Sequence, residues 1–538
     1  MNQPGRLLCL CLIASTLNSL TSVVAYSQER EVRQVGKLSA QDGAANSREA
    51  GQVANQPAQE GFAAPRKEKR PRKTKAATGA PRVDVPGSWS VAMGALSGYG
   101  ITNQSAELQQ WWKNLRDPQL DKLIQQAFAN NLDLKIAQRR VREARAARGV
   151  ASAKRYPEIS EGGTIARRRN VIQTPDGLAA VEGTAFQIGF DANWELDFFG
   201  GVRNSVRAAT AEVTVAEESE RDVMVTMVAE ISRNYVALRG YQRQLAVTRG
   251  NISTQRDTRN LTAVRARAGL ATDLDVSRVE AQLARTESAV PELEAGVADA
   301  VNRLAVLLGT SPGRSPEAGA GTPYTSLSAS LLAGLRTAGP IPPVPSEIPI
   351  GLPSELLRRR PDIRRAESEI IAEAARLGVA KSELYPKFVL SGALGRSANG
   401  GGGLTLGVGN FFALGPSVRL PIFNAGRIRS SIRAQDERVN EALLRYENTV
   451  HVAVEEVENA LADYQGHRDE LAHLERAVSS SRRAVDLSRE LYTAGLADFL
   501  SVLEAQNALY ANEDELARSE AAVVVDLVAL YKALGGGW

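Results

Sequence analysis

Apolar and polar residues alternate strictly over about ten positions in the first half of the chain. The apolar positions are Phe186, Ile188, Phe190, Ala192, Trp194 and Leu196, and the positions between them are Gln187, Gly189, Asp191, Asn193 and Glu195. A period of two is typical of a β-strand that has one apolar and one polar face. Such a strand suits a membrane barrel, in which one face meets lipid and the other meets water.

A similar but weaker alternation occurs in the second half of the chain. Its apolar positions are Leu404, Leu406, Val408, Phe412, Leu414, Val418 and Leu420. Partner strands are expected after Tyr156-Pro157 and after Tyr385-Pro386, which gives strand hairpins over 157–199 and 386–423. Their turns are predicted around Pro175-Asp176-Gly177 and in the glycine-rich stretch 399–403.

Helical spacing dominates the segment that follows each hairpin. Residues 201–268 contain no proline, and apolar residues recur there every three or four positions. A helix of this length spans roughly 100 Å at 1.5 Å per residue. A second long helix is predicted over 425–494. Glycines at 269 and 495 then favour turns into shorter helices over 272–308 and 498–533, for which Thr272 or Asp273 and Asp498 are candidate caps.

The two halves repeat one another in sequence. GVASAKRYPEIS at residue 149 matches GVAKSELYPKFV at 378, and RAGLATDLDV at 267 matches TAGLADFLSV at 493. Tyr156 lies 229 residues before Tyr385, and Gly269 lies 226 before Gly495, so the copies run in register. This internal duplication predicts a first repeat over 132–309 and a second over 361–535. The Gly- and Pro-rich residues 310–360 are read as a linker between them.

The N-terminal 85 residues have a different character. Residues 1–25 have the positive charge and apolar run of a secretory signal, and residues 26–85 are too polar to fold, with a basic run at 66–75. That run is read as a solvated tail, with an arm that touches anionic lipid or cell-wall polymer as the alternative. Cys9 and Cys11 lie inside the signal and lack the context of a lipidation site, so no lipid anchor is expected.

Composition argues against an enzyme. The 538 residues include three histidines, whose spacing does not form a metal-binding motif, and no phosphate-binding glycine loop is present. We therefore expect no catalytic residue, cofactor, metal or nucleic-acid partner. The opening apolar stretch is too short for a membrane anchor, and no other window approaches a run of about 18 apolar residues, so a membrane location must depend on strands.

Four strands cannot close a barrel, because small barrels need about eight. A soluble sandwich is the alternative, but each hairpin leads directly into a helix several times longer than a sandwich is wide. The barrel interpretation therefore requires an oligomer.

Several ordered stretches resemble one known family. They are WWKNLRDPQL at 111–120, NLDL at 131–134, WELDFFG at 194–200, RRPDIRRAE at 359–367 and PIFNAGR at 421–427. Together they resemble the TolC-like outer membrane factor family, and most closely the NodT-type outer membrane proteins of resistance-nodulation-division efflux systems. The resemblance covers roughly residues 85–534. Residues 359–367 also have a purely local explanation, since proline and aspartate favour a helix start.

The resemblance implies an α+β membrane protein that is internally duplicated and homotrimeric. A 12-stranded outer-membrane β-barrel would continue into a periplasmic α-helical coiled-coil tunnel, with an equatorial belt formed by residues 86–131 and 310–360. It implies passive efflux of small toxic compounds, energised by an inner-membrane transporter through a periplasmic membrane-fusion adaptor. A type I protein-secretion duct of the same fold and a periplasmic coiled-coil scaffold without a pore remain as alternatives.

Two groups of site residues are expected. Matching to the family places Leu500 and Glu504 on a ring at the periplasmic gate, with Asp275 forming a hydrogen bond across helices, with Tyr492 as one candidate partner. At the ends of the strands, ring side chains are expected to anchor the barrel at the lipid interface, with ordinary packing as the alternative. These are Tyr156, Trp194, Phe198, Phe199, Tyr385 and Phe423.

Overall fold

The structure is a computed structural model that describes residues 85–90, 98, 101–102, 108–175, 177–312, 331–401 and 404–538. All of them belong to one compact unit, Thr74–Trp538. The predicted export signal, the cysteines and the basic run lie outside the described residues, as do Asp176 and the tip of the second hairpin at 402–403.

Each repeat contains the same elements in the same order. The first has α4 (Leu132–Ala153), β2 (Glu158–Thr174), β3 (Gly177–Leu196), α5 (Gly201–Arg267) and α6 (Asp273–Leu307). The second has α9 (Pro361–Ser382), β5 (Lys387–Gly401), β6 (Leu404–Arg419), α10 (Arg427–Thr493) and α11 (Phe499–Ala533). Corresponding helices have equal lengths of 22, 67 and 35 residues, so the duplication seen in sequence is also present in the elements.

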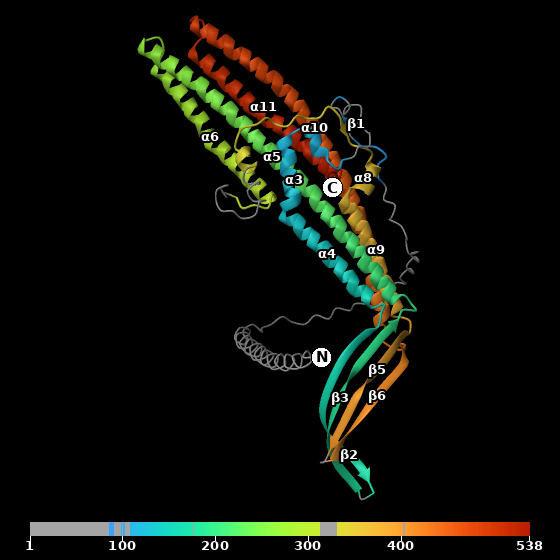
Figure 1. Cartoon of the computed structure of the whole chain (residues 1–538). Coiled ribbons are helices and arrows are strands. Elements are labelled where there is room, and N and C mark those ends of the chain that lie inside the picture. Colours follow the sequence, from blue (N-terminus) through green and yellow to red (C-terminus); the bar gives the residue numbers. More distant parts are fainter. Residues whose placement is uncertain are drawn as a thin grey trace, which may run out of the picture. The chain divides into compact units, whose positions relative to one another are not determined.

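The four long strands form one antiparallel sheet in the order β2-β3-β5-β6 (Figure 1). Its register extends the alternation of β3 across the neighbouring strands. Apolar residues stand opposite one another in rows such as Phe190–Leu394–Phe412 and Leu196–Phe388–Val418. The row Asn193–Ser391, on the opposite face, is polar, and the Ser391 hydroxyl donates to Asn193 Oδ1 over 3.0 Å. One face of the sheet is therefore largely apolar and the other largely polar.

The apolar face is exposed in the single chain. Phe412 is 88% exposed and Leu414 is 77% exposed, far above the values of core side chains. Within the described residues, the outer edges of β2 and β6 also have no partner strand. An exposed apolar face between two unpaired edges leaves the sheet incomplete in one chain.

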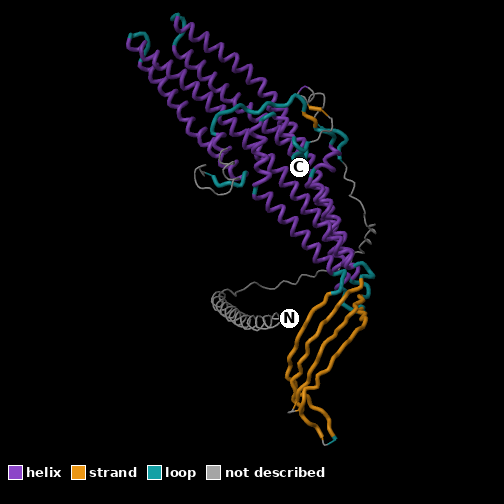
Figure 2. The backbone as a smooth tube through the Cα atoms, viewed as in Figure 1, coloured by secondary structure: helices purple, strands orange, loops and turns teal. Residues whose placement is uncertain are grey.

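The helices follow the same lateral order as the strands. Beside the sheet, α5 packs between α4 and α9, and α9 packs against α10, so these helices stand in the order of the strands to which they connect. Figure 2 shows the strands leading through short loops into the helices. Farther along α5, its neighbours are α6 and α11, and α11 packs against α10. The two 67-residue helices thus run past both sets of shorter helices.

The segments outside the repeats pack against the helices of both repeats. They contain η2 (Trp111–Leu115), α3 (Pro118–Asn130) and α8 (Pro353–Arg359). Helix α3 contacts α5, whereas α8 contacts α9 and α10. The stretch read as an irregular linker includes a short strand, β4 (Ile348–Pro349), which pairs in parallel with β1 (Ile101–Thr102). Two-residue strands have no readable period, which explains why the sequence pattern did not reveal them.

Aromatic packing and a buried arginine attach these segments to the helices. The Trp111 ring stacks on Tyr531 of α11 at 4.9 Å. Arg239 of α5 is 2% exposed, and it donates to the Thr337 carbonyl over 3.0 Å and, through its other terminal nitrogen, to Gln119 of α3. The segments before and between the repeats are thereby attached to α5 and α11.

Candidate functional site

The ring side chains predicted at the strand ends divide into two sets. Trp194 donates from Nε1 to the Arg155 carbonyl over 2.9 Å, and Phe199 stacks on Tyr385 with ring centroids 4.7 Å apart. Phe198 packs edge-on against Phe388 at 5.0 Å. Tyr156 and Phe423 are instead 71% and 89% exposed. The aromatic residues at the ends of the two central strands, β3 and β5, therefore contact other groups of the chain, whereas those next to the outer strands are mostly exposed.

The second predicted site lies at the turns between the long and shorter helices. Gly269 and Gly495 have φ angles of +72° and +73°, which glycine adopts without steric cost. Beyond these turns, the Thr272 hydroxyl caps α6 and the Asp498 carboxylate caps α11. Hydrogen bonds from the Ser501 side chain and backbone hold the pKa of Asp498 below its usual range.

A small hydrophobic cluster closes this end of the helices. It consists of Val279, Tyr492, Phe499, Val502 and Leu503. The Tyr492 and Phe499 rings meet at 5.5 Å, and the Arg265 guanidinium lies 4.4 Å from the centre of the Tyr492 ring. Because Phe499, Val502 and Leu503 point into this cluster, Leu500 and Glu504 occupy a different, exposed face of α11.

Asp275 and Tyr492 are not joined to each other within the chain. The Asp275 carboxylate accepts from the Thr272 amide over 3.0 Å and from its hydroxyl over 2.8 Å, which forms a capping box. The buried Tyr492 hydroxyl has no hydrogen-bond partner among the described residues. In one chain, Asp275 thus acts as a local helix-starting residue.

A third feature was not anticipated from the sequence: the shorter helices meet head to tail halfway along the long ones. At the first junction, Asn131 caps α4 and also donates from Nδ2 to the Leu307 carbonyl at the end of α6, over 2.8 Å. Gly309 approaches so closely that a Cβ there would lie 2.4 Å from the Asn130 carbonyl oxygen. The junction therefore connects the C-terminus of α6 to the N-terminus of α4.

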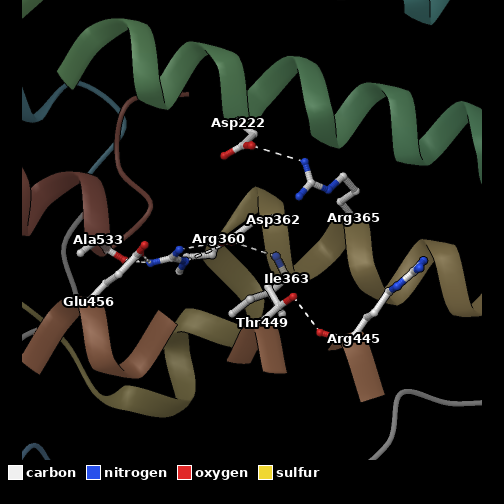
Figure 3. Close-up of polar contacts among 9 residues, drawn as sticks. All are labelled: Asp222, Arg360, Asp362, Ile363, Arg365, Arg445, Thr449, Glu456 and Ala533. Carbon is white, nitrogen blue, oxygen red and sulfur yellow. Dashed lines mark hydrogen bonds and ion pairs between the residues drawn. The ribbon is translucent and has the colours of Figure 1, made fainter. Parts of the chain in front are cut away.

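The second junction uses an arginine in the corresponding place (Figure 3). Arg360 precedes α9, and its Nη1 donates to the Ala533 carbonyl at the end of α11 over 2.8 Å. The same side chain pairs with Asp362 at 2.6 Å and with Glu456 of α10 at 2.7 Å. It therefore ties together three helices.

The Arg360 side chain gives the Arg-Pro-Asp sequence a second role. Pro361 occupies the first turn of α9, as the helix-start interpretation predicts. That interpretation did not reveal the contact of Arg360 with Ala533, because the contact joins residues 173 positions apart. Nearby, burial raises the pKa of Asp222 of α5, although Arg365 lies 3.4 Å away and favours its ionised form.

All three histidines lie on α10. Among the described residues, no group of three or more His, Cys, Asp or Glu side chains is arranged to hold an ion. His467 instead pairs with Asp526 of α11, with Nδ1 and Oδ2 2.5 Å apart, and this contact raises the pKa of the imidazole. Within the part of the chain that the structure describes, the helices also lack a stretch long and apolar enough to cross a membrane.

Solved structures share this arrangement of elements. The chain is similar to the outer-membrane channel OprN, with a TM-score of 0.76 and 32% identity, over 86% of this chain and all of that one. It is also similar to CusC, with a TM-score of 0.69 and 26% identity, over 85% of this chain and 99% of that one.

Sequence comparisons agree with the structural ones. The pyoverdine export outer membrane protein OpmQ of Pseudomonas aeruginosa is 31% identical over 443 residues, which cover 81% of this chain and 89% of that protein. Nodulation protein T of Rhizobium leguminosarum is 28% identical, over 82% of this chain and 90% of that protein. The profile of the outer membrane efflux protein family matches residues 123–310 and 352–536. The chain therefore belongs to the outer membrane efflux protein family.

Proposed function

We propose that three copies of the chain form a passive exit channel of an efflux pump. The observation that carries this proposal is the incomplete sheet, which has one exposed apolar face and two unpaired edges and whose strands connect to a row of helices in the same order. Three copies supply 12 strands, enough to close a barrel around a polar interior. In such a trimer, helices α4, α5, α9 and α10 of each chain continue the wall of the barrel as a helical tunnel.

The barrel places the protein in the outer membrane with its helices in the periplasm. Residues 1–25 serve as the export signal in this proposal, and the aromatic residues at the strand ends lie at the periplasmic edge of the bilayer. The helical turns then form the far end of the tunnel, where an adaptor protein docks and links the channel to an inner-membrane transporter. The channel itself supplies no energy.

At this far end, the exposed Leu500 and Glu504 form the gate. Three copies of Leu500 narrow the passage, and three Glu504 carboxylates favour cations over anions. Asp275 helps to hold the tip shut through a hydrogen bond across helices of the trimer. Tyr492 is the candidate partner, because its hydroxyl has no partner among the described residues of one chain. The exposed face shared by Leu500 and Glu504 supports this assignment.

The transported compounds are expected to be small and toxic to the cell. Related proteins carry diverse names: one is a pyoverdine export protein, one a cation efflux protein and one part of a toluene efflux pump. This variety fits a duct whose cargo is chosen by its pump. The substrate class is therefore best identified by growth measurements.

Deleting the gene should sensitise cells to at least one class of toxic compound, and the wild-type gene should restore resistance. The measurement is the minimal inhibitory concentration across a panel of dyes, antibiotics, solvents and metal salts. The matched control is a plasmid without the gene, which should restore nothing. Unchanged sensitivity to the entire panel, in a strain without other channels of this family, would count against an efflux role.

A further inference from the structure

A cavity opens beside the first turns of α5, next to the junction between strands and helices. Its volume is about 760 Å³. Arg155 borders it from the turn after α4, Phe199 from the turn after β3, and Ile371 from α9. The cavity therefore lies where three elements from both repeats converge.

Positive charge is concentrated in this cavity. Its lining includes Arg155, Arg203 and Arg207, and it includes no carboxylate. Arg203 pairs with Asp197 over 3.3 Å. The guanidinium groups of Arg155 and Arg207 have no hydrogen bond or ion pair among the described residues. Two of the three arginines are thus available to an anion.

The remaining lining suits a ligand that is both charged and apolar. Thr210 borders the cavity, while Phe199 and Ile371 are 43% and 49% exposed and add apolar surface. The Thr210 hydroxyl already donates to the Val206 carbonyl over 2.8 Å, so its oxygen is left to accept. A lipid headgroup with hydroxyls, a phosphate and the start of its acyl chains matches these three kinds of contact.

The position of the cavity along α5 decides which part of the membrane it lies near. Its lining residues on α5 run from Arg203 to Thr214, within the first four turns of that helix, and α5 follows the turn after β3. In the proposed trimer, these first turns lie directly beneath the barrel, at the level of the lipid headgroups.

We propose that this cavity binds the phosphate group of an anionic phospholipid from the inner leaflet of the outer membrane. The inference rests on the proposed function, which places the strand ends at that leaflet. Arginine matches phosphate oxygens with two parallel N–H donors, so Arg155 and Arg207 are the residues that hold the headgroup. Phe199 and Ile371 contact its glycerol and upper acyl carbons.

The test is native mass spectrometry of the detergent-extracted protein with phosphatidylglycerol or with phosphatidylcholine of the same acyl chains. The variant is Arg155→Gln with Arg207→Gln, and a second variant has lysine at both positions. The control, Arg483→Gln with Arg489→Gln, removes the same charge from exposed positions of α10. A parallel arm adds inorganic phosphate to the lipid-bound protein, which separates a lipid site from a free-anion site.

The wild type should retain phosphatidylglycerol about tenfold better than phosphatidylcholine. The glutamine variant should lose this preference, the lysine variant should keep part of it and the control should keep all of it, with no displacement by phosphate. Equal retention of both lipids, an equal loss in the control, or displacement by phosphate would overturn the proposal. If the wild-type protein gives one of these contrary results but is still a conducting trimer, only the lipid site is rejected. If the wild-type protein forms no trimer, the proposed function is rejected as well.

Discussion

Replacing Leu500 and Glu504 together by alanine is expected to raise the single-channel conductance several-fold and to lower the preference for cations. The two side chains lie one turn apart on the exposed face of α11, next to the turn at Gly495. In the proposed trimer, shortening three leucine side chains to methyl groups widens the passage, and removing three carboxylates abolishes the ring that attracts cations. Planar-bilayer recordings with a salt gradient measure both effects.

The first repeat offers a matched control for this experiment. Leu274 and Glu280 are exposed near the corresponding turn of α6. The double alanine variant at these positions removes the same residue types from the other hairpin and should leave conductance close to that of the wild type. Unchanged conductance in a correctly assembled Leu500→Ala, Glu504→Ala trimer, or an equal increase in the control, would reject the gate assignment.

Arg360→Ala is expected to be the most destabilising of the single substitutions considered for this chain. The side chain is 7% exposed and holds the end of α11 and the start of α9 together. Its loss leaves Asp362 without its cation and the Ala533 carbonyl without its donor. Removing one partner of a buried pair typically costs about 3 kcal/mol. The thermal unfolding midpoint, followed by circular dichroism, should fall clearly.

Arg445→Ala is the control for this loss. Arg445 also pairs with a carboxylate, Glu441, but the two side chains are 66% and 56% exposed. Solvent screens such a pair, so its removal should cost less than about 1 kcal/mol. Similar unfolding midpoints for the two variants would show that the junction at Arg360 contributes little to the stability of the helices.

The local elements could be predicted from sequence because their signals are local. The alternation from Phe186 to Leu196 indicates β3, and the absence of proline over 201–268 indicates α5, which ends at Arg267. Turn chemistry was equally readable, since Gly269 and Gly495 have positive φ and Thr272 and Asp498 cap the following helices. Each of these features depends on neighbours within a few residues.

The contacts that the sequence did not reveal join residues far apart in the chain. The Arg360 contact with Ala533 is one example, and the environment of Trp538 is another. Its ring lies 4.8 Å from Arg221 and 5.2 Å from Arg364, and both arginines pair with the buried Glu218. Each residue type has an ordinary local explanation, so periodicity gave no reason to connect them. The arginine-lined cavity was not predicted for the same reason.

The association of three chains is the central claim, and the mass of the detergent-extracted protein tests it most directly. Four strands per chain with two open edges require partners, and three copies give the 12 strands of the proposed barrel. The unheated complex should have the mass of three chains and should dissociate to single chains only after heating. A stable monomer or dimer in mild detergent would contradict the account.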